Sequence, residues 1–191
     1  MQRGVRELRI VGGTLRGRKW SFPDAPGLRP TPDRVRETLF NWLGPDIAGC
    51  RCLDLFAGSG ALGLEALSRG ATAVTFIERD GAAARDLSQR LQEWGATGAK
   101  VLQMDALAFL GAPPAARFDI VFLDPPFDAG LLAPAARQLE ARGWLAPAAR
   151  IYAECPADEE LPELPRTWQP HRAKRAGEVG YHLLIRSAAT T

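Results

Sequence analysis

A glycine corner at Gly58-Ser59-Gly60 constrains the fold of this chain more than any other stretch. Residues 50–56 before it are mostly apolar, which predicts a short strand buried on both faces. Residues 60–69 after it are helix formers with apolar side chains at helical spacing, which predicts a helix. Glycines allow the sharp turn and let a ligand approach the main chain, where the free N–H groups of the helix point. The stretch therefore predicts a ligand-binding corner.

The kind of ligand depends on Asp54. Residues 58–63 match the dinucleotide pattern G-x-G-x-x-G. Asp54, however, interrupts the strand four residues before the first glycine, and we expect the strand to continue through Ala57. A carboxylate in this position suits a ligand with an ammonium or sulfonium charge better than a pyrophosphate. The alternative is that Asp54 only caps the following turn.

Strand and helix patterns alternate from residue 50 onward. The predicted strands cover residues 50–56, 73–78, 100–104, 118–124 and 150–155, and the predicted helices cover 60–69, 80–94, 106–110 and 130–142. Alternation of this kind builds a parallel sheet covered by helices on both faces, with a ligand crevice outside the carboxyl ends of the strands. After residue 155, strands over 167–169 and 181–186, joined by a basic turn over 172–177, are predicted to form a terminal antiparallel pair.

Acidic residues fall at the ends of successive predicted strands, namely Asp54, Glu78, Asp105 and Asp124. Glu78 lies 18 residues after Gly60, close to the interval at which an acid meets ribose hydroxyls in nucleotide-binding sheets. Asp105 is placed to accept from the amine of an adenine, with the alternative that it caps the short helix that follows. For Glu78 the alternative is a charge at a helix start.

The turn Asp124-Pro125-Pro126-Phe127 follows an apolar run and carries the predicted chemistry. The prolines stiffen the turn, so that the Asp124 carboxylate and the Pro125 carbonyl can both accept hydrogens of one planar amino group. Phe127 can stack on the base that carries this group. Holding both hydrogens turns the nitrogen lone pair toward an electrophile, and ionised Asp124 stabilises the developing positive charge. The alternative is a rigid structural turn with Phe127 in the core.

The N-terminal segment is basic although the net charge of the chain is only +2. Residues 1–36 contain nine basic and three acidic side chains, which gives +6 there and −4 for the remainder. Two short strands over 8–11 and 18–22 predict a hairpin, and Thr31-Pro32 predicts a helix start with Thr31 as N-cap. Such a segment predicts contacts with RNA phosphates, for which the candidates are Arg3, Arg9, Arg16, Arg18, Lys19 and Arg34. The alternative is a solvated basic tail.

Composition favours a soluble protein. The first residues lack the apolar block of a signal peptide, and no run approaches bilayer length. Cys50, Cys52 and Cys155 are too few for a disulfide framework, and their spacing is not that of a zinc site, so we expect buried reduced thiols. We therefore expect a cytoplasmic protein without a membrane partner.

Two sets of residues resemble known families. Asp54-Leu-Phe-Ala-Gly-Ser-Gly together with Asp124-Pro-Pro-Phe resembles class I S-adenosylmethionine-dependent amino-methyltransferases. The segment from Arg29 to Leu43, together with Arg9-Ile-Val-Gly-Gly13 and Arg16-Gly-Arg18, is similar to the bacterial RsmD family. That family methylates the N2 amine of a guanine in 16S ribosomal RNA.

The resemblance implies an α/β fold with a Rossmann-like, mostly parallel seven-stranded sheet, a hairpin extension over residues 1–30 and a methyltransferase domain over 31–191. It implies S-adenosylmethionine as the cofactor, no metal, and a monomer that acts on 16S ribosomal RNA within the assembled small subunit. The implied catalytic turn comprises Asp124, Pro125, Pro126 and Phe127, which would hold an extruded guanine. The implied cofactor residues are Thr31, Asp54, Phe56, Gly58, Ser59, Gly60, Glu78, Arg79, Asp105 and Ala106.

Three other functions fit parts of the pattern. An adenine-N6 methyltransferase of DNA or RNA uses a similar turn, but no target-recognition domain is evident in 191 residues. A nicotinamide-dependent oxidoreductase would use the G-x-G-x-x-G pattern but leaves the Asp124 turn unexplained. An RNA-binding assembly factor with a vestigial pocket would not need intact Asp54, Glu78 and Asp124.

Overall fold

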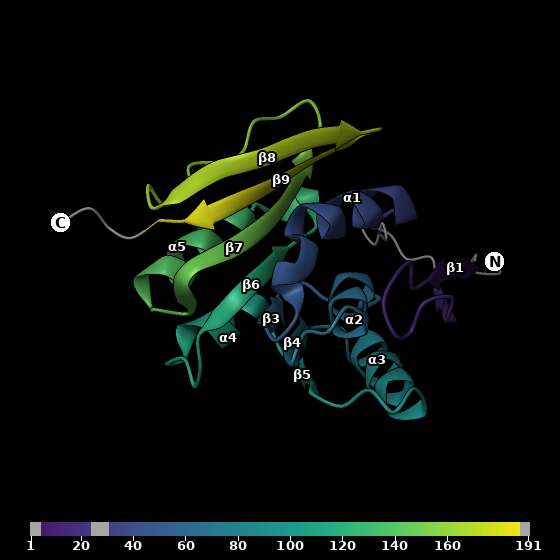
Figure 1. The fold of residues 1–191 in the computed structure, drawn as a ribbon. Coiled ribbons are helices and arrows are strands. Elements are labelled where there is room, and N and C mark those ends of the chain that lie inside the picture. Colours follow the sequence, from purple (N-terminus) through teal and green to yellow (C-terminus); the bar gives the residue numbers. More distant parts are fainter. Residues whose placement is uncertain (1–4, 24–30, 188–191) are drawn as a thin grey trace.

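Seven strands of the described residues form one sheet in the order β5-β4-β3-β6-β7-β9-β8 (Figure 1). The computed structural model describes residues 5–23 and 31–187. The parallel strands are β3 (Arg51–Asp54), β4 (Ala73–Glu78), β5 (Ala99–Gln103), β6 (Phe118–Leu123) and β7 (Leu145–Pro156). β9 (Val179–Arg186) runs antiparallel to β7 and to the edge strand β8 (Trp168–Ala176). The predicted α/β class and mostly parallel seven-stranded sheet are confirmed.

The chain reverses its direction across the sheet between β3 and β6. From β3 it passes outward to β4 and β5, then returns to place β6 on the other side of β3. The connecting helices are α2 (Ala61–Ser68), α3 (Gly81–Glu93), α4 (Ala106–Gly111) and α5 (Leu132–Ala141). In sheets of this kind, ligands bind outside the carboxyl ends of the strands where the order reverses. No helix in the described part of the chain is long and apolar enough to cross a bilayer.

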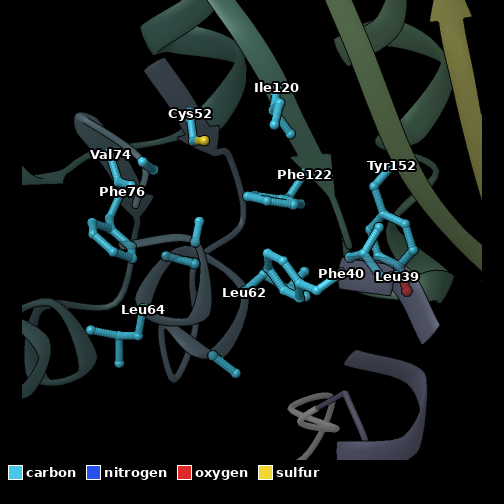
Figure 2. Packing of buried hydrophobic residues seen from close by; sticks show 14 of the residues in the cluster. Leu39, Phe40, Cys52, Leu62, Leu64, Val74, Phe76, Ile120, Phe122 and Tyr152 are labelled. Atoms are coloured by element: carbon cyan, nitrogen blue, oxygen red, sulfur yellow. The ribbon is translucent and has the colours of Figure 1, made fainter. Parts of the chain in front are cut away.

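Successive strand residues alternate between two buried layers, one on each face of the sheet. One layer joins strand residues to α1 (Asp33–Leu43), α2 and α3, and contains Cys52, Phe76, Ile120, Phe122 and Tyr152. The other joins them to α4 and α5, and contains Leu53, Ile77, Val121, Leu123 and Ile151. Figure 2 shows Phe40 of α1 beside Phe122 of β6, and their ring centroids are 6.0 Å apart. The helix α1 is therefore part of the core of the sheet.

Two glycines let the corner between β3 and α2 lie close to its neighbours. Gly60 precedes α2 with φ of 78°, and a Cβ there would lie 2.5 Å from a Leu87 methyl carbon. Gly63 lies inside α2, where a Cβ would lie 2.2 Å from the Phe76 ring. A larger residue at Gly63 would push α2 away from β4, so this glycine is needed for close approach rather than for an unusual backbone angle.

The strands β1 (Val5–Arg9) and β2 (Lys19–Pro23) form a separate antiparallel hairpin whose turn region contacts α2. Glu65 of α2 is fully buried, and its carboxylate accepts from the backbone N–H groups of Val11 and Gly12, each at 2.8 Å. It also forms ion pairs with Arg69 at 2.7 Å and with the fully buried Arg36 of α1 at 3.4 Å. One buried carboxylate thus links the hairpin to both helices.

The strand at the glycine corner is shorter than predicted. We predicted a strand over residues 50–56 that continues through Ala57, but β3 ends at Asp54. The backbone N–H of Leu55 then donates to Phe122 of β6, and that of Ala57 donates to Ile77 of β4. The chain therefore leaves β3 and closes over the ends of both neighbouring strands.

Two other local predictions were wrong. The basic residues 172–177, predicted as a turn, lie mostly within β8, and the turn follows at Gly177 and Glu178. Thr31 was predicted as the N-cap of the first helix, but α1 begins at Asp33, Pro32 occupies the cap position, and no side chain caps it. The hydroxyl of Thr31 instead contacts two carboxyl groups.

The cysteines have free thiols. Cys52 and Cys155 are buried as predicted, whereas Cys50 is only partly buried because β3 begins one residue after it.

Candidate functional site

Three predicted acids lie at one end of the sheet, where the strands β3, β4 and β6 terminate. Asp54 is the last residue of β3, Glu78 is the last of β4, and Asp124 directly follows β6. These strands are adjacent and parallel, so their ends meet at the point where the chain order reverses. The charge of Glu78 raises the pKa of Asp54, and that of Asp54 raises the pKa of Asp124. The three acids therefore lie within electrostatic reach of one another.

The glycine corner is held by two of these acids. The Asp54 carboxylate accepts from the Gly63 N–H at 3.0 Å inside α2. The Glu78 carboxylate accepts from the Gly58 N–H and the Asp80 N–H, each at 2.7 Å and each on a different oxygen. A carboxylate has about four acceptor positions, so Glu78 keeps a free lone pair on each oxygen for hydroxyl donors. The acids hold the corner and still have acceptor capacity for a ligand.

Burial sets the protonation of Asp54. Its side chain is almost completely buried, and loss of hydration raises its pKa to about 7. The Gly63 N–H opposes this rise, and the charge of Glu78 adds to it. Among the side chains described in residues 7–22 and 31–187, no arginine or lysine forms an ion pair with Asp54, Glu78 or Asp124. A cluster of acids without a cationic partner suits a ligand that brings its own positive charge.

The residues of the turn after β6 differ in their exposure to solvent. Pro125 is buried, Pro126 is exposed, and Phe127 begins a short 3₁₀ helix, η2 (Phe127–Ala129). Phe127 is partly exposed, so it is not a core residue of this turn. An aromatic ring that remains accessible beside Asp124 can stack on a planar base.

Asp124, which is partly exposed, contacts the buried Thr31 beside the buried Glu154, in a polar group that the sequence did not predict. The Thr31 hydroxyl lies 3.4 Å from an Asp124 carboxylate oxygen and 3.2 Å from a Glu154 carboxylate oxygen. The Tyr152 hydroxyl donates to the same Glu154 oxygen at 2.7 Å. Burial and the charges of Glu154 and Asp54 raise the pKa of Asp124 well above its usual value. Burial also raises the pKa of Glu154, although its two hydroxyl contacts partly offset this.

The remaining predicted cofactor residues occupy different positions around the corner. Ser59 is buried between the two glycines of the corner, and Phe56 is partly exposed before them. Arg79 is exposed after β4. Asp105 is exposed and accepts from the Ala108 N–H at 2.9 Å as the N-cap of α4, beside the buried Ala106. The alternative role that we considered for Asp105, a helix cap, is therefore confirmed.

The predicted RNA-binding residues are exposed on the hairpin and on α1, and several already have partners. Arg9 pairs with Asp33 at 2.7 Å, Lys19 pairs with Glu7 at 2.8 Å, and Arg18 lies over the Trp94 ring at 5.6 Å. Arg16 and Arg34 are exposed. Arg3 lies outside the described residues.

Sequence reasoning missed Glu154, Tyr152, Arg36 and Glu65. The available signal for Glu154 was an acid inside the apolar run of residues 151–155. Arg36 and Glu65 gave no such signal, because each lies in an amphipathic or apolar helix pattern and its burial depends on residues far away in the sequence.

The described residues contain no cluster of three or more histidine, cysteine or acidic side chains that could hold a metal ion. A groove of about 400 Å³ lies between α3 and β5, but none of the predicted cofactor residues lines it.

Comparison with known proteins gives consistent similarities. The family model described as conserved hypothetical protein 95 matches residues 8–185. The "Ribosomal RNA small subunit methyltransferase D" of Escherichia coli K12 is 52% identical over 185 residues, which cover 97% of this chain and 93% of that relative. The solved structure of yhhF from Escherichia coli has a TM-score of 0.89 and 49% identity, and covers 96% of this chain and 99% of that one. An RNA methyltransferase of Salinibacter ruber, solved with S-adenosyl-L-homocysteine, shares the fold at a TM-score of 0.64 and 16% identity, over 85% of this chain and 97% of that one.

Proposed function

This chain belongs to the RsmD family, described as conserved hypothetical protein 95, and from this premise we propose that it methylates 16S ribosomal RNA. The methyl donor is S-adenosylmethionine, and the acceptor that we propose is the exocyclic N2 amine of a guanine. The observation that carries the proposal is the Asp124-Pro125-Pro126-Phe127 turn, which lies at the reversal of strand order beside Asp54 and Glu78.

The acids and the glycine corner fit this cofactor. Bound S-adenosylmethionine would supply an electrophilic methyl group on a sulfonium centre. We propose that Asp54 and the backbone of Gly58, Ser59 and Gly60 hold the methionine part, and that Glu78 accepts from the ribose hydroxyls through its free lone pairs. Other proposed cofactor contacts are Thr31, Phe56, Arg79, Asp105 and Ala106. The acids have no ion-pair partner among the side chains that the structure describes, which supports a cationic ligand.

The proposed role of the turn is to prepare an amino group for attack. The Asp124 carboxylate and the Pro125 carbonyl would accept the two hydrogens of the guanine amine, and Phe127 would stack on the base. A nitrogen lone pair freed from the ring in this way can attack the methyl carbon, and ionised Asp124 stabilises the positive charge on nitrogen. The base must be extruded from the RNA stack to reach this position.

The basic hairpin supports RNA as the substrate. We propose that Arg3, Arg9, Arg16, Arg18, Lys19 and Arg34 contact phosphates of the ribosomal RNA within the assembled small subunit. Arg16 and Arg34 are the clearest candidates, because no ion pair in the described residues involves either of them, while Arg9 and Lys19 pair with acids. We further propose that the protein acts as a monomer in the cytoplasm.

The decisive experiment compares substrates with labelled S-adenosylmethionine. Small subunits from cells that lack this protein, naked 16S ribosomal RNA and duplex DNA are incubated with the pure protein, and the labelled nucleoside is identified by mass spectrometry. We expect N2-methylguanosine in RNA. Label confined to DNA, or N6-methyladenosine as the product, would favour an adenine methyltransferase. Calorimetric binding of NAD but not of S-adenosylmethionine would favour an oxidoreductase.

A further inference from the structure

The edge strand β8 is exposed along almost its whole length. Trp168 is buried at its start, but every residue from Gln169 to Arg175 is exposed. β8 pairs only with β9 and ends the sheet, so its other side has no strand neighbour among the described residues. Figure 1 shows it at the end of the sheet, with α1 between it and the hairpin strand β1 in this view. A surface strand that buries so little has no packing requirement for most of its side chains.

The exposed part of β8 is positively charged. His171, Arg172, Lys174 and Arg175, which we call the basic edge, all lie within five residues, while Glu178 is the only acid between Trp168 and Tyr181. No ion pair in the described part of the chain uses any of these four side chains. The positive charge of Arg175 lowers the pKa of His182 on the neighbouring strand, after the larger effect of burial. The basic edge is thus a concentration of charge without an ion-pair partner among the residues that the structure describes.

The strand register places the basic edge beside the proposed catalytic turn. Lys174 pairs with Tyr181 of β9, and Tyr181 pairs with Glu154 of β7. Leu123 pairs with Ala153, so Asp124 follows β6 at the level of Glu154. β8 runs in the same direction as β6 and β7. Its basic C-terminal part therefore lies at the carboxyl ends of the parallel strands, where the catalytic turn also lies. Three strand spacings of roughly 4.8 Å each separate the two positions.

The directions of the side chains also favour RNA on the face of the sheet that α1 covers. Residues that pair directly in an antiparallel sheet point to the same face. Lys174 therefore shares the face of Tyr181, and Arg172 shares that of Leu183. Tyr181 stacks on Trp42 of α1 at 5.4 Å, so this face is the one that α1 covers. Arg172 and Lys174 point to the same side of the sheet as α1 and the Thr31 contact with Asp124.

We propose that the basic edge is a second RNA-binding surface, which holds the sugar-phosphate backbone of the substrate next to the nucleotide in the catalytic turn. This inference rests on the proposed function, since it requires that RNA enters at Asp124. An RNA strand that leaves the turn toward β8 on the side of α1 meets Lys174 and the guanidinium group of Arg172, which binds phosphate oxygens in bidentate fashion, while Arg175 adds positive charge from the other face of the strand. Backbone contacts of this kind position a substrate without reading its sequence.

Lysine and arginine on an edge strand can also prevent pairing with other chains. In β8 that task is already served by Pro170, which cannot donate to a partner strand, and by the irregular register between Pro170 and Arg172. Protection of β8 against pairing with another chain therefore does not explain why Arg172, Lys174 and Arg175 cluster near its C-terminal end.

The test is the triple variant Arg172→Gln, Lys174→Gln, Arg175→Gln. Its matched control replaces two arginines and one lysine that are exposed at the amino ends of the parallel strands, away from the catalytic turn: Arg51→Gln, Lys100→Gln, Arg117→Gln. Binding to 16S ribosomal RNA and to small subunits is measured between 50 and 200 mM salt. We expect the logarithmic salt slope of the basic-edge variant to decrease in magnitude by about 2 and KM for small subunits to rise about tenfold or more. S-adenosylmethionine affinity should not change.

Equal salt slopes and equal KM values for the two triple variants would overturn the proposal. If the basic-edge variant aggregates, the single reversal Lys174→Glu is measured in its place, with Lys100→Glu as control, and an unchanged salt slope overturns the proposal equally. Methylation by the wild-type protein distinguishes failure of this proposal from failure of the proposed function. Failure of the wild-type protein to methylate RNA would reject the proposed function, whereas normal methylation with an unaltered slope would reject only the basic edge.

Discussion

The carboxyl groups of Asp124 and Glu154 contact the same hydroxyl, that of Thr31, at 3.4 and 3.2 Å. A hydroxyl has only one proton to donate, so it cannot donate to both carboxylates at once. Burial raises the pKa of both acids, and the charge of Glu154 raises that of Asp124 further. The two acids therefore compete for one donor, and Glu154 opposes the ionisation of Asp124. On the proposed mechanism Glu154 is a positioning residue, because it would act on the amine only through Asp124.

The first prediction concerns the pH dependence of methyl transfer. Only ionised Asp124 stabilises the positive nitrogen, so turnover should rise with pH through the raised pKa of Asp124. Glu154→Gln removes the neighbouring charge and should move this rise to lower pH. Thr31→Val removes a hydrogen bond that lowers the pKa of Asp124 and should move the rise to higher pH. The measurement is the pH profile of kcat with saturating RNA; shifts in the same direction for both variants would contradict the coupling.

The second prediction separates catalysis from binding. Asp124→Ala removes the contact to the developing charge, so kcat should fall by a factor on the order of 10² or more. S-adenosylmethionine affinity, measured by calorimetry, should change little, since Asp54 and Glu78 are intact. Asp128→Ala, an exposed acid in the adjacent 3₁₀ helix, is the matched control and should retain activity. Unchanged turnover in Asp124→Ala would reject the mechanism.

The third prediction concerns stability and pH. The folded state raises the pKa of Asp54 from 3.8 to about 7, so between these values the folded protein binds one proton more than the unfolded chain. The free energy of unfolding should then decrease as pH rises from 4 to 7, by on the order of 4 kcal/mol for this group alone. Asp54→Asn removes this component, and the slope should become less negative by roughly 1.4 kcal/mol per pH unit. Urea unfolding at several pH values tests this, and parallel slopes for the two proteins would disprove it.

The fourth prediction concerns the buried ion pairs of Glu65. Glu65→Ala leaves the buried Arg36 with Asp33 as its remaining ion-pair partner and leaves the N–H groups of Val11 and Gly12 without an acceptor. We expect a loss of roughly 3–5 kcal/mol in the free energy of unfolding. Glu93→Ala, which removes an exposed acid at the end of α3, should change it by less than about 0.5 kcal/mol. Equal losses in urea unfolding would show that the buried carboxylate has no special role.

The sequence predicted those parts of the fold that depend on local patterns. The apolar run before Asp124 and the run that ends at Glu78 are strands, because their side chains meet helices on both faces of the sheet. The basic residues of β8 were wrongly predicted as a turn because neither face of most of this strand is buried, and the alternation that identifies a strand is therefore absent.

The candidate site was only partly predictable for a related reason. Asp54, Glu78 and Asp124 mark the ends of predicted strands, and parallel strands bring their ends together. The roles of Thr31 and Glu154 depend on a contact between segments 123 residues apart, which no local pattern encodes. The same holds for the burial of Arg36, because two of its partners, the Arg9 carbonyl and Glu65, lie on the hairpin and on α2.

The close fit of Gly63 against Phe76 limits how the pocket can be redesigned. α2 cannot retreat from β4 without opening a gap in the core, and it cannot advance because the ring already touches its backbone. Space for a bulkier alkyl group on a synthetic methyl-donor analogue must therefore come from the accessible side, where Phe56 and Phe127 are only partly buried. We therefore expect that trimming Phe56, rather than the glycine corner or the base-stacking Phe127, would make room for larger transferred groups.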